Sequence, residues 1–599
     1  MATIFKCFSP LGRMNNAGAA LVLIALLAYL YGLSSPYAPT NGDEMVYIHI
    51  ARMTAESGHW LPLQSQIVDT RNTKPPLLFW QAMVAGNWGQ HWELGALRLP
   101  SVFYTFATTA LLAFFTFRIS GKFATACTAA ALYLLFFSTF RYGRVYLTSA
   151  PETFWLALPM WWVLWSRLGK NRPSAASAPL APSDPEATDF SWLTYTGFGL
   201  AFGLGAAYKS FALIAPAAAG LWTAIVLSPP RIQWRDTWRA TWGVGWSAVV
   251  GLSIFALWFV VDPDPGAVWQ EFIVAENAGK MTTGQGYWHA ALLGAYPMWT
   301  QLFAYPENAG LLFFVAIGLL LSRLPIVFKK SSYARLAPHE WILLAWLVVW
   351  LIVFTLPSQR SARYVIPAMP ALAIVAALLW DRIRLAWFWI TLLIAVPALV
   401  MLARITWVMG SMDIASPSQV TFTLLCASAG FISIVAGIAR QSWCKQGTLW
   451  CVLAVYLTFS AMVAPLNKTS DSYLRAAQTE LFGRTVAVPN GFTGQFERFH
   501  FILPGVNITP YDAEGRNTGA FEPNLPSDER LLYLLRSFDA VVWIQDDLTN
   551  VSPSCMPQCQ SLGSRWHVKS RHKAGEITLE NVWYPDQWLF RREWLLRAN

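Results

Sequence analysis

Apolar segments of about 20 residues, the length that crosses a bilayer as a helix, recur through the first 466 residues of this chain. Every backbone N–H and C=O group must be satisfied internally in a membrane, so runs of this length are expected to fold as spanning helices. The composition agrees, because 55% of the 599 residues are hydrophobic and 13% are charged, unlike a soluble domain. We expect thirteen spans, near residues 17–34, 95–117, 123–140, 146–166, 192–207, 210–228, 241–261, 307–322, 339–356, 364–380, 386–408, 419–438 and 448–465.

Basic residues indicate how these spans are oriented. If the N-terminus is cytoplasmic, every second loop also lies on the cytoplasmic side. Each of these loops carries lysine or arginine, as the positive-inside rule requires. An odd number of spans then places the C-terminus outside. We interpret the first segment as a span rather than a cleaved signal peptide, because the acidic Asp43 follows it closely and no small-x-small cleavage site stands out. The loop residues are Arg118, Lys122, Arg167, Lys170, Arg172, Arg231, Arg235, Arg239, Lys329, Lys330, Arg335, Arg382, Arg384, Arg440 and Lys445.

The same loops account for most of the net charge of +10, so the charge is no indication of nucleic-acid binding, and we expect no nucleic-acid partner. The stretch 171–190 is rich in Ala, Pro and Ser and predicts a disordered cytoplasmic linker.

Residues 467–599 differ in character from the membrane part at 1–466. Short strand-like runs alternate with turn residues such as Asn490-Gly491, which predicts a small outer α/β domain tethered to the last span. It contains no nucleotide loop, catalytic triad spacing or metal signature that we recognise. The expected elements are strands at 485–488, 500–503, 506–510 and 540–545, a helix at 527–538 and a hairpin across 565–583.

Two cysteines of this outer domain, Cys555 and Cys559, lie four residues apart. An oxidising compartment would permit a disulfide between them. A zinc site is the alternative, but it needs further ligands, and His567 and His572 are the histidines nearby.

Ionisable residues gather in the segments that we expect outside, which are 36–94, 141–145, 262–306 and 467–599. Asp43 and Glu44 follow the first span, and Lys74 comes about thirty residues later. Charges at a membrane interface are costly unless paired or used, and an acid and a base together indicate chemistry on a phosphate-bearing substrate. The pattern predicts helices over 45–53 and 77–84, which would place Asp43 and Lys74 near helix N-termini. Alternatively, Asp43 is a helix cap and Lys74 a snorkelling lysine.

Four motifs occur in a characteristic order, side and spacing along the membrane part. They are Gly42-Asp43-Glu44, Lys74-Pro75-Pro76-Leu77, Leu97-Arg98-Leu99-Pro100-Ser101 and Arg363-Tyr364-Val365-Ile366-Pro367 with Pro370. In these motifs the chain resembles the polyprenyl-phosphate-sugar-dependent glycosyltransferases of the GT-C fold. Within them it is most similar to the bacterial lipid A aminoarabinose transferases, which are related to the protein O-mannosyltransferases.

The resemblance implies an inner-membrane enzyme of about thirteen helices that binds a sugar linked to undecaprenyl phosphate. In an inverting transfer, an acceptor oxygen would attack the anomeric carbon and displace the lipid phosphate. Asp43 matches the family's catalytic acidic position and would act as general base or orient the acceptor, with Glu44 as its neighbour. The residues that would hold donor phosphate, and so stabilise charge on the leaving group, are Lys74, Arg363, Tyr364, Arg360, Lys209 and Arg98.

Further outer residues are candidates for lining the substrate cavity, each with a structural alternative. Glu152 would either line the cavity or neutralise Arg141 or Arg144. Arg98 would either bind substrate or pair with an acidic neighbour. His289 would either line the cavity or be structural, as a lone histidine often is. Glu276 matches the first residue of an acidic-Asn pair in related transferases, or belongs to a solvated loop. The lining candidates are Tyr47, Arg141, Arg144, Glu152, Glu276 and His289.

Departures from the aminoarabinose transferase pattern leave the sugar open. Val46 stands where that family typically has an Arg, and Arg71-Asn72-Thr73 replaces Tyr-x-Glu before Lys74. Ser149 lies where an acidic residue is expected, with Glu152 one turn later. We therefore expect transfer of a sugar to lipid A or another envelope glycan, with membrane lipids as surroundings, no cofactor, and a divalent cation left open. The alternatives are protein O-glycosylation and, in a different class, a flippase for lipid-linked sugars.

Overall fold

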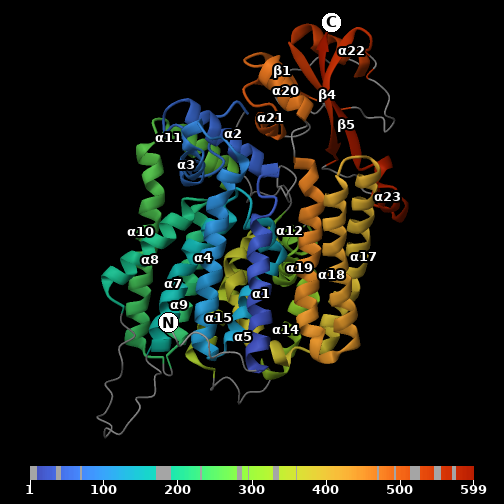
Figure 1. The fold of residues 1–599 in the computed structure, drawn as a ribbon. Helices are drawn as coiled ribbons and strands as arrows, with labels where there is room; N and C mark the ends of the chain where they lie inside the picture. The colour runs from blue at the N-terminus through green and yellow to red at the C-terminus, as the bar shows by residue number, and fades with distance from the viewer. Residues whose placement is uncertain are drawn as a thin grey trace, which may run out of the picture.

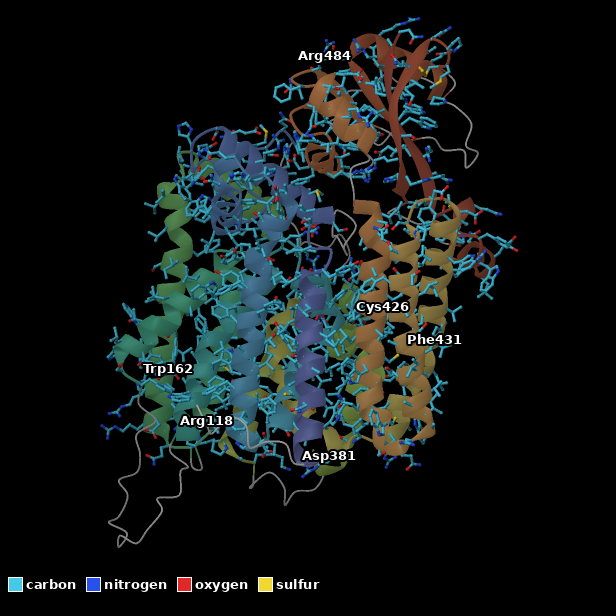
Figure 2. The ribbon with its side chains drawn as sticks, viewed as in Figure 1. Arg118, Trp162, Asp381, Cys426, Phe431 and Arg484 are labelled. Atoms are coloured by element: carbon cyan, nitrogen blue, oxygen red, sulfur yellow. A yellow bond between two sulfur atoms is a disulfide. The ribbon has the colours of Figure 1, made fainter. Side chains whose placement is uncertain are left out.

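A bundle of long helices makes up the larger part of the computed structural model, and a small sheet domain stands on one end of it (Figure 1). The N-terminal helix α1 begins at the opposite end of the bundle, where Asp381 and Arg118 also lie (Figure 2). The structure describes residues 10–35, 42–67, 70–169, 190–229, 232–278, 286–294, 296–327, 336–358, 360–467, 471–490, 494–512, 527–544, 553, 555–569 and 575–599.

A helix lies in each of the thirteen segments that we expected to be spans. Seven described helices are long and apolar enough to cross a membrane, and shorter apolar helices accompany them. The chain is therefore a multi-pass membrane protein, while the number of spans stays a prediction. The helices are α1 (Pro10–Leu30), α4 (Leu94–Ser120), α5 (Phe123–Leu135), α7 (Ser149–Gly169), α8 (Trp192–Ala206), α9 (Ile214–Leu227), α10 (Trp234–Val261), α13 (Ala304–Ala309), α14 (Phe313–Val327), α15 (Pro338–Thr355), α16 (Met369–Leu378), α17 (Leu385–Ser411), α18 (Pro417–Ala439) and α19 (Gln441–Val463).

Glycines let some of these helices approach closely. A Cβ added to Gly199 of α8 would come within 2.6 Å of the Val250 side chain on α10, and one at Gly243 of α10 would meet the Tyr195 ring at 2.2 Å. Lipid tails are as apolar as the helices, so close backbone packing rather than hydrophobic burial favours association of helices in a membrane. The α8–α10 pair therefore depends on these small residues.

Shorter helices, among them α2 (Gly42–Glu56), α3 (Pro76–Ala85) and α11 (Pro265–Val268), cover the end of the bundle on which the sheet domain stands, to one side of that domain (Figure 1). The two helices that we predicted in the first outer segment are confirmed as α2 and α3. Pro75 is the extended residue before α3 and Pro76 begins it, a position where a missing N–H group costs nothing. The third outer segment forms α11, the π-helix η3 (Trp269–Ala278) and α12 (Tyr287–Leu293).

The C-terminal part contains a five-stranded sheet in the order β2-β1-β3-β5-β4. β1 pairs in parallel with β2 and β3, and β5 pairs antiparallel with β3 and β4. Alternate residues of β1 point to opposite faces, so Val486 and Val488 join one apolar cluster and Ala487 joins another. The elements are α20 (Asp471–Thr479), β1 (Thr485–Asn490), α21 (Phe499–Ile502), β2 (Asn507–Asp512), α22 (Ser527–Ser537), β3 (Ala540–Ile544), β4 (Cys559–Val568), α23 (Leu579–Trp583) and β5 (Phe590–Ala598).

Two of our expectations for this part were wrong. Residues 500–503 are not a strand, because Phe499 and Ile502 are buried together at the three-residue spacing of a helical turn, in α21. The hairpin across 565–583 is also wrong. β4 pairs instead with β5, and α23 occupies the connection because the Thr578 hydroxyl caps its first turn. The strands at β1, β2 and β3 and the helix α22 are confirmed.

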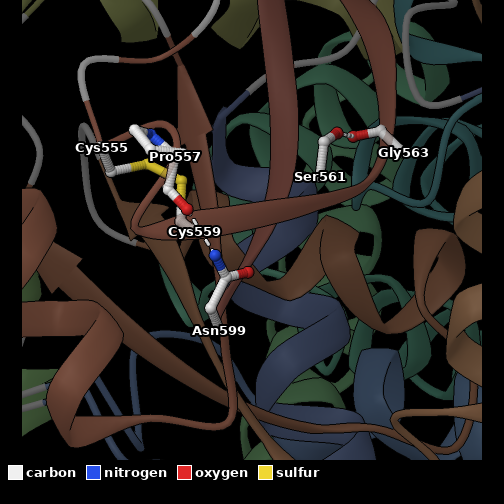
Figure 3. Close-up of a disulfide and its surroundings, with 6 residues drawn as sticks. All are labelled: Cys555, Pro557, Cys559, Ser561, Gly563 and Asn599. Atoms are coloured by element: carbon white, nitrogen blue, oxygen red, sulfur yellow. Dashed lines mark hydrogen bonds between the residues drawn. A yellow bond between two sulfur atoms is a disulfide. The ribbon is translucent and has the colours of Figure 1, made fainter.

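Cys555 and Cys559 form a disulfide at the start of β4 (Figure 3), so the zinc alternative is wrong. His572 lies outside the described residues. So does the linker that we predicted at 171–190, apart from its last residue.

Candidate functional site

Asp43 and Arg363 come together from opposite parts of the membrane chain. Asp43 is in the first turn of α2, where the helix dipole favours a carboxylate. Arg363 is in the 3-10 helix η7 (Ala362–Ala368), directly before α16. Their closest oxygen and nitrogen are 3.5 Å apart, and the two side chains are 47% and 34% exposed. The Asp43 carboxylate is thus accessible to a substrate while a cation faces it.

Lys74 lies in a loop that acidic side chains of the third outer segment hold in place. Its ammonium group is 2.9 Å from the Glu276 carboxylate and 5.8 Å from the centre of the Tyr47 ring. Arg71 pairs with Asp264 at 2.9 Å. The backbone N–H of Asn72 also donates to Glu271, at 3.0 Å. These contacts fix the position of Lys74 relative to η3.

Lys209 supplies a third cation from the turn between α8 and α9. It pairs with Glu152 of α7 at 3.0 Å and lies 5.7 Å from the centre of the Tyr364 ring. Burial lowers the pKa of Lys209, Glu152 opposes this, and the positive charges of Arg363 and Lys74 lower the pKa further. The three cations are therefore close enough to influence one another. The next residue, Ser210, donates to the side chain of Asn277, so Glu276-Asn277 contacts both cationic loops.

Glu44 and Arg98 form a fully buried ion pair. Both guanidinium contacts to the carboxylate are 2.7 Å, and the carboxylate also accepts the backbone N–H of Tyr146. Arg98 donates as well to the carbonyls of Leu33 and Ser35, after α1. The pair connects α2 to α4, and neither side chain is exposed. We expected Arg98 either to bind substrate or to pair with an acidic neighbour, and the structure shows the pairing, with Glu44.

The remaining candidates lie in different surroundings. Arg144 is buried and donates to the Ser460 hydroxyl and the Tyr31 carbonyl, whereas Arg141 lies 5.2 Å from the centre of the Tyr142 ring. Arg360 is buried and donates to main-chain carbonyls of Thr355 and Tyr296. His289 is on the exposed surface of α12. Glu152 therefore pairs with Lys209 rather than with either arginine.

Tyr142 is a residue of this site that we did not single out from the sequence. The guanidinium groups of Arg363 and Arg141 lie 4.7 and 5.2 Å from the centre of its ring, within the range of cation–π attraction. Its position in the short outer segment 141–145, next to Arg141, was an available signal. Tyr47 and Tyr364 face Lys74 and Lys209 in the same manner.

Chemically, the site combines three cations, and each of them faces a carboxylate and a tyrosine ring. The carboxylate that faces Arg363 is that of Asp43, which is accessible to a substrate. Cations so arranged can bind a phosphate in place of their carboxylate partners. Within the described ranges, no three His, Cys, Asp or Glu side chains gather closely enough to hold a metal ion.

Comparisons with known proteins agree with this architecture. No family model matches the chain. It is 26% identical over 380 residues to undecaprenyl phosphate-alpha-4-amino-4-deoxy-L-arabinose arabinosyl transferase 1 of Sodalis glossinidius, covering 61% of this chain and 59% of that protein. The corresponding transferase of Pectobacterium atrosepticum is 25% identical over 377 residues, covering 59% and 58%. The chain thus spans somewhat under two thirds of the length of these relatives.

Among solved structures, ArnT from Cupriavidus metallidurans bound to undecaprenyl phosphate superposes with a TM-score of 0.55 at 15% identity, covering 98% of each chain. Its apo state gives a TM-score of 0.52 at 14% identity, covering 96% of this chain and 97% of that one. The chain therefore has the GT-C membrane fold of ArnT with a small C-terminal sheet domain, and its sequence is similar to those of the aminoarabinose arabinosyl transferases.

Proposed function

We propose that this chain is an inverting glycosyltransferase that moves a sugar from an undecaprenyl-phosphate donor to an acceptor at the outer face of the membrane. Lipid A or another envelope glycolipid is the leading acceptor. The observation that carries the proposal is the convergence of Lys74, Lys209 and Arg363, from three distant segments, near the exposed carboxylate of Asp43. The similarity to arabinosyl transferases supports the same donor class.

In this proposal the cations receive the donor phosphate and Asp43 prepares the acceptor. Arg363, Lys74 and Lys209 stabilise the negative charge that builds on the phosphate as the sugar–oxygen bond breaks. Asp43 accepts the proton of the attacking hydroxyl, or orients it, which calls for an accessible carboxylate. Glu44 and Arg98 act indirectly, because their buried pair fixes the helix that carries Asp43. Tyr47, Tyr142 and Tyr364 form walls beside the cations.

The proposal includes an orientation and a division of the chain. The protein lies in the bacterial inner membrane with its N-terminus in the cytoplasm. Residues 1–466 form the transferase domain, and residues 467–599 form a periplasmic domain. Consistent with this, the basic loop residue Arg118 lies at the end of the bundle opposite the sheet domain (Figure 2).

Mass spectrometry of lipid A tests the proposal directly. A deletion strain is complemented with the parent chain, with Asp43→Asn or with Asp381→Asn, a matched change at the opposite end of the bundle. We expect the parent and Asp381→Asn chains to restore a sugar-sized mass increment and the Asp43→Asn chain to fail at equal expression. A restored increment with Asp43→Asn would exclude Asp43 as the base.

The same strains test the protein-acceptor alternative, and purified protein in liposomes tests the transporter alternative. If lipid A is identical in all strains while a glycoprotein changes mass, the acceptor is protein. If purified chain in liposomes moves the lipid-linked sugar across the bilayer without consuming it, the chain is a transporter, and the proposal fails.

A further inference from the structure

The described part of the connection between β4 and β5, residues 575–589, contains a helix and a 3-10 turn and is not a simple loop. Thr578 caps α23 by accepting the backbone N–H of Asn581 at 3.1 Å. The Asn581 side chain donates to the Glu576 carbonyl at 2.6 Å, and the Trp588 indole donates to the Asn581 carbonyl. Lys569, just before the segment, pairs with Glu576 at 2.8 Å. These polar groups of the connection thus form hydrogen bonds with one another and stabilise its conformation.

The large apolar side chains of this connection remain outside that internal structure. Leu579 is 92% exposed, Ile577 67%, Trp583 51% and Tyr584 44%. Four large apolar side chains are thus exposed within eight residues, and soluble proteins seldom expose such a group unless it contacts something.

The location of the connection indicates what these side chains contact. α23 lies beside the outer end of α17 (Figure 1). The Arg404 guanidinium of α17 donates to the Trp583 carbonyl at 2.8 Å and lies 5.2 Å from the centre of its ring. Close to Arg404 on the same helix, Val400 and Trp407 are 41% and 62% exposed, as lipid-facing side chains of a spanning helix are. The exposed apolar side chains of the connection therefore continue the lipid-facing surface of α17.

We propose that residues 575–589 insert into the outer surface of the lipid bilayer and anchor the C-terminal domain there. Trp and Tyr, with a polar tip on an apolar ring, favour the headgroup region, and Leu579 and Ile577 reach the acyl chains below it. The contact with Arg404 sets the depth of the segment. The anchor would hold the domain at a fixed height above the membrane, independently of the chain that follows α19. This inference doesn't depend on the chemistry that the site performs.

Site-specific fluorescence in nanodiscs tests the proposal. The five cysteines outside the disulfide are replaced by serine, and the environment-sensitive dye NBD is attached at Leu579→Cys or Ile577→Cys. Phe482→Cys is the matched control. Phe482 is also apolar and 72% exposed, and it lies in the same domain, two residues before Arg484, which Figure 2 shows at the side remote from the bundle. Quenching is measured with iodide in water and with lipids that carry a nitroxide on the acyl chain.

We expect the dye at positions 579 and 577 to be quenched by the nitroxide lipid and to be at least about threefold less sensitive to iodide than at position 482. Iodide sensitivity equal to that at position 482 would overturn the proposal. Protection from both quenchers would also overturn it, because the surface would then be covered by another copy of the chain or by a different protein.

A second measurement uses the native cysteines, in case the serine background folds poorly. Amide hydrogen exchange of residues 577–584 is compared between the parent chain and Leu579→Asp in nanodiscs, with Phe482→Asp as control. We expect exchange to be at least about threefold faster in Leu579→Asp and unchanged in Phe482→Asp. Equal rates in parent and Leu579→Asp would contradict insertion.

Discussion

His49 of α2 and Glu497 of the C-terminal domain share a buried hydrogen bond of 2.9 Å across 448 residues of chain. The other ring nitrogen of His49 accepts the backbone N–H of Gln66, so the nitrogen facing Glu497 is the one that carries the proton. Arg52 adds two contacts to the same carboxylate, at 2.6 and 3.1 Å. The sheet domain is thus bonded to the helix that carries Asp43.

Substitution of Glu497 by Gln should loosen the domain from α2, because Arg52 and His49 would lose a buried charged partner. Breaking a buried ion pair typically costs about 3–5 kcal/mol, and Arg52 retains Glu56 at 2.7 Å, so we expect about 3 kcal/mol. Hydrogen exchange of residues 46–56 and 494–503 should accelerate about a hundredfold. Glu480→Gln, in a half-exposed pair with Arg597 at 3.8 Å, is the control and should cost less than about 1 kcal/mol. Equal effects of the two substitutions would contradict the role of Glu497.

The same contact predicts that acid releases the domain. Burial alone would raise the pKa of Glu497, but His500, His49 and Arg52 outweigh it and lower the pKa from 4.5 to about 2. A carboxyl with a lowered pKa stabilises the docked state above pH 4.5, and that contribution, about 3 kcal/mol, is lost as the pH falls from 4.5 towards 2. Burial also lowers the pKa of His500 below 6.5, so its protonation favours release below that pH.

Exchange measured from pH 7 to pH 3, corrected for intrinsic rates, checks this dependence. The parent chain should lose protection at α2 gradually below pH 6.5 and steeply below 4.5, whereas Glu497→Gln should lack the steep part. A parent profile that stays flat below pH 4.5 would show that Glu497 is not the group responsible.

Arg98→Met should destabilise the membrane part, because it leaves the Glu44 carboxylate buried without its cation. We expect a loss of about 3–5 kcal/mol, seen as a lower unfolding temperature in detergent. The double substitution Glu44→Gln/Arg98→Gln should recover more than half of this loss, since the two amides can still hydrogen-bond. Arg440→Gln, at an exposed position, is the control. If the double variant is no more stable than Arg98→Met, the ion pair is not the cause.

Glu276→Gln should tighten binding of undecaprenyl phosphate, because Glu276 competes with phosphate for Lys74. Loss of this competition is expected to lower Kd about tenfold, equivalent to about 1.4 kcal/mol, whereas Lys74→Gln should raise Kd by a similar factor. Binding to the protein in nanodiscs measures both, with Glu480→Gln as control. Weaker binding by Glu276→Gln would mean that Glu276 mainly positions the Lys74 loop.

Several local features were predictable from the sequence because they depend on neighbouring residues. The periodicity of 45–53 and the position of Pro76 predicted α2 and α3, and short apolar runs bounded by turn residues predicted β1 and β3. The prediction of a strand at 500–503 was wrong for a physical reason. A short apolar run suits a strand or one helical turn equally, and packing against the sheet decided for the helix.

The sequence by itself determined a multi-pass membrane fold, the outer helices and the identity of the ionisable residues there, because apolar length, charge asymmetry and turn residues are local quantities. Only the tertiary structure decided which acid faces which base. Glu44 meets Arg98 across 54 residues, Glu152 meets Lys209 across 57, and Glu276 meets Lys74 across 202. An ion pair requires contact within about 4 Å, and the packing of distant helices sets that contact.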